Sequence, residues 1–337
     1  MRVLVSNRGD AAAYYRVIAP FSVLRLSEGL DVMFGIPVLG VAEEFDALWL
    51  QMDVGAEMEL IAREFKDAGK PVIYDVDDWL FGYPPSWYNY DAYFNRGTGQ
   101  HSALLRSHAR LLALADVVTT TTAYLADKLR TQAQRVELLP NCVLQGDWDT
   151  LLPLRHTFDG LVVGWFGTGN HWEEWYELAP ALDEALAAIG GYLSLIGAPE
   201  LVTCFPRRLV ERTFVADLVS MADFDQMRCA IMSFDVGLAW ATDRLEVARC
   251  RSPLKAIQYG AAGVPVLASA QVYGDLLGDS YGFTFKTPQD LAAGLVQMYG
   301  DGDAWADMLL HRENWQQQVW AHHTYETQAY RWLKVLR

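Results

Sequence analysis

Residues 249–269 read RCRSPLKAIQYGAAGVPVLAS and decide the fold that the sequence predicts. Ser252 and Pro253 are typical of a helix start, because serine caps free backbone N–H groups and proline suits the first turn. Apolar residues then recur at helical spacing as far as Gly263. The next residues, 264–268, form a short apolar run that is typical of a buried parallel strand.

The residues just upstream complete a repeating unit. Residues 234–240 (FDVGLAW) predict the preceding strand, so the order is strand, loop, helix, strand. The loop carries Arg249 and Arg251, and Lys255 lies one turn into the helix. Free N–H groups and the helix dipole both favour negative charge at a helix N-terminus. We therefore expect a diphosphate to bind here.

The same stretch resembles the donor-binding segment of GT-B glycosyltransferases, in particular the retaining, family 4-like enzymes of bacteria and phages that use nucleotide sugars. Many members carry two glutamates with seven residues between them, of which the second usually binds the ribose. Those positions are Cys250 and Gln258 here, so the resemblance implies an uncharged ribose partner, Gln258. The positions that match are Lys255, Gln258, Tyr259, Ala261, Ala262, Gly263, Pro265, Val266, Ala268 and Ser269.

Length and composition bound the class of protein. A chain of 337 residues with 52% hydrophobic residues favours two α/β domains over one. The net charge of −15 disfavours general nucleic-acid affinity, although a local basic groove remains compatible with it. No apolar run reaches about 18 residues, and the N-terminus does not resemble a signal peptide. The four cysteines form no CxxC pair, so we expect a cytoplasmic protein with reduced thiols.

Two series of alternating strands and helices follow each other along the chain. They predict the GT-B architecture, which is two Rossmann-like, doubly wound parallel-sheet domains facing a cleft. Residues 139–142 (LPNC) resemble the segment at which GT-B chains cross between domains. The expected boundaries are an acceptor domain over 1–143, a linker over 144–158, a donor domain over 159–304 and a C-terminal helix over 305–337 that crosses back.

Three carboxylates, Asp75, Asp77 and Asp78, directly follow the predicted strand 71–74. The carboxyl end of a parallel strand is where ligands bind. One of these residues can act as an acceptor base, the first two can form an Asp-x-Asp metal motif, or all three can cap a turn. A similar D-x-D-D in the bacterial and phage branch supports the first alternative.

Other residues of the first half are candidates for acceptor binding. Gly9 lies in the first loop, and Arg16 lies in YYRVIAP, which resembles a motif of the same branch; Arg16 either reaches the cleft or lies on a solvated helix face. The aromatic segment 79–94 either stacks an acceptor or packs on its own domain. Its candidate residues are Trp79, Tyr83 and Trp87. The basic segment 96–110 either follows an anionic acceptor or forms a solvated helix face.

The donor half begins with the predicted strand 161–166, followed by a small-residue loop that lets backbone N–H groups approach a phosphate. The loop residues are Gly167, Thr168, Gly169, Asn170 and His171. His171 either bonds the diphosphate or caps the next helix. The remaining candidates for donor binding are Glu246, Arg251, Ser252, Pro253, Leu254 and Gln258.

These features predict a hexosyltransferase-like enzyme in which Lys255, Arg249 and the helix N-terminus stabilise the leaving diphosphate. No metal or other cofactor is required, and UDP-sugars are favoured over GDP-sugars. The acceptor is a glycan or surface polymer, or a hydroxymethylated base of phage-type DNA. A catalytically silent GT-B-like binding protein and a nucleotide-sugar epimerase are the alternatives. The sequence sets neither the stereochemical outcome nor the oligomeric state.

Overall fold

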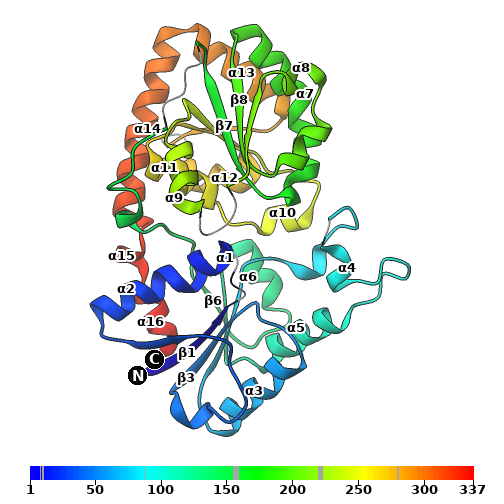
Figure 1. Ribbon diagram of the computed structural model, residues 1–337, viewed down its shortest axis with the longest axis vertical. Helices are drawn as coiled ribbons and strands as arrows, with labels where there is room; N and C mark the ends of the chain where they lie inside the picture. The colour runs from blue at the N-terminus through cyan, green and yellow to red at the C-terminus, as the bar shows by residue number, and fades with distance from the viewer. Residues whose placement is uncertain (8, 10, 88, 155–158, 219–222, 279–280) are drawn as a thin grey trace. The chain divides into compact units, whose positions relative to one another are not determined.

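The computed structural model describes residues 1–7, 9, 11–87, 89–154, 159–218, 223–278 and 281–337. The chain folds into two compact units, each built on one six-stranded sheet (Figure 1). The first unit comprises Met1–Cys142, Leu245–Ser252 and Tyr325–Arg337, and the second comprises Val143–Arg244 and Pro253–Thr324. Residues 155–158 of the predicted linker lie outside the described residues.

The sheet of the first unit is entirely parallel, with strand order β2-β1-β3-β4-β5-β6. Five of its strands match the strands that short apolar runs predict at 3–6, 45–51, 71–74, 116–119 and 136–139. The sixth, β2, was not predicted, because its four residues DVMF lie at the sheet edge and are too short to give a clear period. The strands are β1 (Arg2–Asn7), β2 (Asp31–Phe34), β3 (Ala47–Gln51), β4 (Val72–Val76), β5 (Val117–Thr120) and β6 (Val136–Leu138).

Helices pack against this sheet, because the apolar faces of the sheet and of the helices must be buried against each other (Figure 1). Residues 11–27 are helical, and a π-helical turn, η1 (Tyr14–Ile18), separates α1 (Ala11–Ala13) from α2 (Ala19–Ser27). The others are η2 (Ala42–Glu44), α3 (Ala56–Asp67), η3 (Leu80–Gly82), α4 (Tyr90–Tyr93), α5 (Ala103–Leu114), α6 (Ala123–Leu129), α10 (Glu246–Cys250), α15 (Tyr325–Gln328) and α16 (Tyr330–Leu336).

The second unit repeats the arrangement, with strand order β12-β11-β10-β7-β8-β9 and parallel pairing throughout. The strands are β7 (Val162–Gly167), β8 (Tyr192–Gly197), β9 (Thr213–Ala216), β10 (Val236–Ala239), β11 (Val266–Ser269) and β12 (Phe283–Phe285). The helices are η4 (Gln145–Asp147), η5 (Gly169–His171), α7 (Trp172–Ile189), η6 (Pro199–Cys204), α8 (Arg207–Val210), α9 (Phe224–Ile231), α11 (Leu254–Ala262), α12 (Ala270–Leu277), α13 (Pro288–Gly300) and α14 (Gly302–His322).

Two local expectations for the second unit differ from the structure. Residues 207–210 were expected to form a strand or turn, but they form the helical turn α8, which follows Pro206 and buries Leu209. The edge strand β9 was not predicted, because its four residues, TFVA, are partly exposed and too few to give a clear period. Both elements lie at the sheet margin, where burial imposes little sequence pattern.

The helix α11 begins later than its sequence suggests. Pro253 is the N-cap residue and no side chain caps the helix, whereas Ser252 was expected to do so. Ser252 stands one residue too early for its hydroxyl to reach the first free N–H groups. Its Oγ is buried and has no hydrogen-bond partner among the residues that the structure describes. At the other end, Gly263 has φ 66° and terminates the helix in the left-handed conformation, as expected for glycine.

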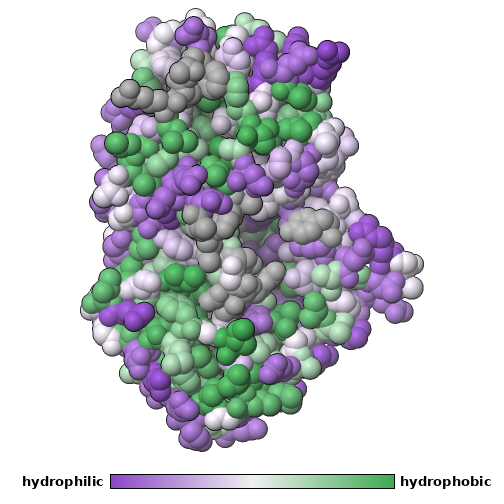
Figure 2. Space-filling view, in the orientation of Figure 1, coloured by the Kyte–Doolittle hydropathy of each residue, from purple (hydrophilic) through white to green (hydrophobic). Residues whose placement is uncertain are grey.

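Hydrophilic side chains gather over the loop between α4 and α5 and over α7 and α8 in the view of Figure 2. In the first of these regions Arg96 forms an ion pair with Asp91, and in the second Arg207 forms one with Glu211. Among the described residues, no helix combines the length and the apolar character that a membrane span needs. All four cysteines are free thiols, and burial raises the pKa of Cys142 to about 12.

Candidate functional site

The predicted donor loop lies at the carboxyl end of β7, a central strand of the second sheet. Gly167 ends β7, and a Cβ atom at this position would lie 2.7 Å from the Trp165 ring and 3.2 Å from Nζ of Lys255. A Cβ atom on Gly169 would lie 2.2 Å from a carboxylate oxygen of Glu200. Both glycines therefore allow side chains to approach the loop backbone closely, which a larger residue would prevent.

Lys255, His171 and Glu174 form a chain of polar contacts beside this loop. Nδ1 of His171 lies 2.9 Å from Oε2 of Glu174, and Nε2 lies 3.0 Å from Nζ of Lys255. A carboxylate can only accept, so Nδ1 carries the proton of a neutral ring and Nε2 accepts from the lysine. Glu174 thus fixes the histidine tautomer, and the histidine orients the ammonium group.

The surroundings of Lys255 strengthen its electrostatic effect. Its Nζ lies 5.2 Å from the centroid of the Trp165 ring and 5.7 Å from that of Phe166. Both rings are nearly buried, and Lys255 itself is half-buried. A cation beside apolar rings is less screened by water than a surface lysine, so it attracts an anion more strongly. The arrangement can bind phosphate oxygens.

The other donor candidates of this unit lie on the same two segments. Thr168 is exposed and Asn170 is half-buried in the loop after β7, and Pro253 and Leu254 are half-buried at the start of α11. Gln258, the expected ribose partner, is 2% exposed. Glu174, which the sequence analysis did not select, has a recognisable signal: it follows His171 by three residues at a helix start, where the two side chains can meet.

In the first unit, Asp75 and Arg16 form a fully buried ion pair. Nε of Arg16 lies 2.9 Å from one carboxylate oxygen of Asp75, and Nη2 lies 2.6 Å from the other. Nη1 of Arg16 donates to the carbonyl of Leu139 and to Oδ1 of Asn141. Burial alone would lower the pKa of Arg16, but the Asp75 carboxylate offsets this effect and the pKa is raised.

This pair does not resemble an acid–base site. Both side chains are 0% exposed, and Thr119 Oγ1 donates a further hydrogen bond to Asp75. A base needs a carboxylate that can reach a substrate proton, and Asp75 is enclosed by protein donors. Arg16 is equally enclosed, so its guanidinium does not reach a surface where an acceptor could lie.

The other two aspartates of the cluster are less buried. Oδ2 of Asp78 accepts from the Tyr83 hydroxyl at 2.7 Å, and Oδ1 accepts from the Trp79 backbone N–H. Burial, followed by the Asp78 charge, raises the pKa of Tyr83 well above its usual value. Asp78 therefore organises the turn, while Asp77 is half-buried directly after β4. Among the described residues, no group of three or more potential ligands is placed to hold a metal.

Four residues expected at the donor site, Glu246, Arg249, Arg251 and Ser252, belong to the first unit. The first two lie in the helix α10, where a loop was predicted. Val247 and Cys250 are fully buried in the core of this unit. Glu246 pairs with Lys128, which lowers the pKa of that carboxylate, and it also accepts from Nε1 of Trp79 at 2.9 Å. These contacts hold α10 on the first unit.

Both arginines of this segment also face aromatic rings of the first unit. The Arg249 guanidinium lies 4.5 Å from the centroid of the Tyr124 ring, and that of Arg251 lies 5.2 Å from the Trp87 ring. Sequence proximity to Lys255 does not indicate these contacts. They depend on side chains more than 120 residues away along the chain.

The remaining candidates of the first unit are mostly enclosed. Trp79, Tyr83 and Trp87 are 8%, 7% and 2% exposed, so their rings pack in the core of this unit and offer little open stacking surface. In the basic segment, His108 is fully buried, and burial lowers its pKa to about 3, so it is neutral. Gly9 is exposed, with φ 70°.

Comparisons with known proteins identify the fold of the chain. No protein-family description matches the chain, and no curated protein is similar to it in sequence. Among solved structures, sucrose-phosphate synthase from Thermosynechococcus elongatus is similar, with TM-score 0.69, 14% identity, and 99% of this chain and 98% of that chain covered.

Two further structures are similar over their whole length. An alpha-glucosyltransferase in complex with UDP-glucose and DNA containing an abasic site has TM-score 0.66 and 12% identity, with 100% and 99% coverage. HepE of Anabaena in complex with UDP and glucose has TM-score 0.64 and 16% identity, with 100% and 99% coverage. The two parallel sheets and these likenesses define the fold: the chain has the GT-B fold.

Proposed function

We propose that this chain is a glycosyltransferase that moves a hexose from a UDP-sugar to an acceptor hydroxyl. The observation that carries the proposal is the Lys255 ammonium group, 3.0 Å from Nε2 of His171 and beside the glycine loop that ends β7. Two structures of similar fold contain UDP or UDP-glucose, which supports this nucleotide.

The chemical difficulty of the reaction is the departure of UDP. Negative charge grows on the diphosphate as its bond to the anomeric carbon breaks, and a fixed cation lowers the energy of that state. An ammonium group has three N–H donors, of which one points to His171. In the proposed complex the ammonium group also donates to phosphate oxygens of the UDP-sugar. The proposed mechanism assigns leaving-group stabilisation to Lys255, and it needs no metal for that role.

The acceptor side of the proposal rests on the first unit. If the reaction inverts the anomeric carbon, a base must take the acceptor proton, and Asp77 is the member of the 75–78 cluster that we assign to this role. Asp77 is half-buried directly after β4, whereas the Asp75 carboxylate is fully buried against Arg16. If the reaction retains the configuration, no aspartate base is required.

Replacement of Lys255 tests the proposal directly. Lys255→Ala should lower UDP-sugar turnover by about 100- to 1,000-fold, the usual effect of removing one electrostatic stabiliser of a transition state. The fold should persist, because the side chain is half-buried and its hydrogen-bond partner His171 keeps its contact with Glu174. UDP release from UDP-glucose is the readout. Lys286→Ala, which removes an exposed lysine of the same unit, is the matched control.

Binding separates this proposal from its alternatives. UDP at about 100 times its dissociation constant should stabilise the folded protein by about 2.7 kcal/mol. A shift with UDP that survives EDTA, together with loss of turnover in Lys255→Ala alone, supports the proposal. Binding without turnover points to a silent binding protein, and conversion of the donor without an acceptor points to an epimerase. Normal turnover in Lys255→Ala contradicts the proposal.

The acceptor is tested separately. One of the similar structures contains DNA, which keeps a hydroxymethylated base among the candidates beside a glycan or surface polymer. Labelled sugar should move either to hydroxymethylated DNA and not to plain DNA, or to the polymer alone. Transfer to plain DNA would contradict both acceptor proposals, because plain bases offer no hydroxyl.

A further inference from the structure

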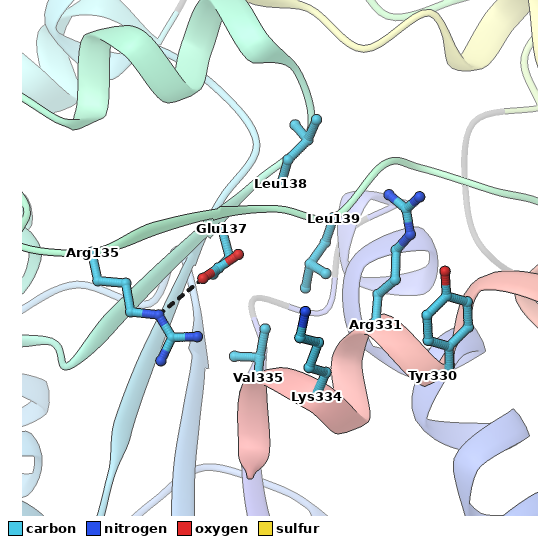
Figure 3. Close-up of a pocket in the computed structure, with 8 residues that line it drawn as sticks. All are labelled: Arg135, Glu137, Leu138, Leu139, Tyr330, Arg331, Lys334 and Val335. Atoms are coloured by element: carbon cyan, nitrogen blue, oxygen red, sulfur yellow. Dashed lines mark hydrogen bonds and ion pairs between the residues drawn. The ribbon is translucent and has the colours of Figure 1, made fainter.

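A pocket of about 280 Å³ in the first unit lies between β6 and α16 (Figure 3). The strand β6 forms the edge of its sheet, and α16 is the last helix of the chain. All the residues that line the pocket belong to the first unit. The proposed glycosyl transfer uses none of them, so the pocket needs its own explanation.

The lining of this pocket is cationic. Arg135, Arg331 and Lys334 contribute three positive charges, and Glu137 contributes one negative charge. Glu137 accepts from Nε of Arg135 at 2.9 Å, so these two charges are paired. Arg331 and Lys334 form no hydrogen bond or ion pair with the residues that the structure describes. The pocket therefore keeps two unneutralised cations, in a chain whose net charge is −15.

These two cations lie on one face of α16. They are three residues apart, a spacing that places side chains side by side on a helix. In Figure 3 both rise from α16 toward the chain at Leu138 and Leu139. Two adjacent cations on one rigid element suit a ligand with two negative charges better than a single carboxylate. A phosphomonoester carries between −1.5 and −2 charges at neutral pH, and arginine binds phosphate oxygens in a bidentate manner.

The rest of the lining suits a hydroxylated ring. Glu137 has lone pairs beyond the one that Arg135 uses, and these can accept from a sugar hydroxyl. Tyr330 is 58% exposed and Leu138 is 41% exposed, so each presents apolar surface. The volume lies at the small end of ligand pockets, which suits a compact molecule. We propose that the pocket between β6 and α16 binds a small phosphomonoester of a polyhydroxy compound, independently of the nucleotide site.

Calorimetric titration at about 50 mM salt tests this assignment, since higher salt would screen the cations. The probes are inorganic phosphate and glucose 6-phosphate. Removing both cations, in Arg331→Ala/Lys334→Ala, should weaken the binding of both probes by about tenfold or more, the effect of losing a charge-assisted hydrogen bond. The control Arg25→Ala/Lys286→Ala removes the same charge from exposed positions outside the pocket and should leave both affinities unchanged.

Further variants separate this pocket from the nucleotide site and from a bare anion site. Binding of both probes should persist in Lys255→Ala. Tyr330→Ala should weaken glucose 6-phosphate but not inorganic phosphate, which has no ring to contact. The proposal is overturned by absence of saturable binding, by loss of binding in Lys255→Ala only, or by equal loss in both double variants. Equal affinity for the two probes in the native protein would overturn the assignment of a polyol.

Discussion

Replacing Asp75 with asparagine should destabilise the first unit strongly, and this is the sharpest test of the site as we describe it. Both carboxylate oxygens of Asp75 accept from Arg16, and both side chains are fully buried. Asp75→Asn leaves the guanidinium buried without a counter-charge. Breaking a buried pair in this way costs about 3–5 kcal/mol. For domains of 150–250 residues this corresponds to a loss of roughly 6–20 °C in Tm.

Urea unfolding and calorimetry of the variant measure this loss, and Asp77→Asn is the matched control. Asp77 is half-buried two residues away, so the same change there should cost about 1 kcal/mol or less. The double variant Arg16→Met/Asp75→Leu should lose less stability than the two single variants combined, because it leaves no unpaired charge. If the effects of the single variants add within about 0.5 kcal/mol, the two residues do not act as a pair. An Asp75→Asn protein of native stability and no activity would refute the structural role and restore Asp75 as a catalytic residue.

Two further predictions concern packing and pH. Because the pKa of His108 is about 3 in the folded protein and about 6.5 when unfolded, its contribution to stability is complete above pH 6.5 and declines below it. From pH 7 to pH 5, the free energy of unfolding should therefore fall by about 2 kcal/mol more in the native protein than in His108→Gln. Urea titration measures this difference, and the exposed His101→Gln is the control. Gly260→Ala should cost about 1–3 kcal/mol, because its Cβ would lie 2.5 Å from Nε1 of Trp315. Gly274→Ala, in a helix with open space around it, should instead be neutral or stabilising, and an equal loss of Tm in both would contradict this account.

The order of strands and helices is largely a property of the sequence. Short apolar runs such as 162–166 and 266–269 form strands that are buried inside the sheet, so their hydrophobic pattern identifies them as strands. The strands that escaped prediction, β2 and β9, lie at sheet edges and are partly exposed. These residues form strands because they pair with a neighbouring strand, and the local amino-acid pattern does not predict that pairing.

The loop after β7, which we propose binds the donor, illustrates what local sequence can indicate about a site. Its glycines and Lys255 are separated by almost ninety residues, but each stands at a strand end or helix start that its own neighbours define. Parallel strands place such ends at the same edge of a sheet, so their approach follows from the topology. Glu174 was missed because a glutamate in a first helical turn is common, and only the contact with His171 gives it a specific role.

The sequence by itself determined the two α/β units and the pairing of a glycine loop with a lysine at a helix start. Both depend on local periodicity and on the glycine and proline residues that end or begin helices and strands. Only the tertiary structure decided that Asp75 is neutralised by Arg16, 59 residues away, and that residues 245–252 pack on the first unit. Burial and charge pairing are set by side chains from distant elements. Whether a carboxylate is a base or a structural anchor therefore becomes visible only when those elements are brought together.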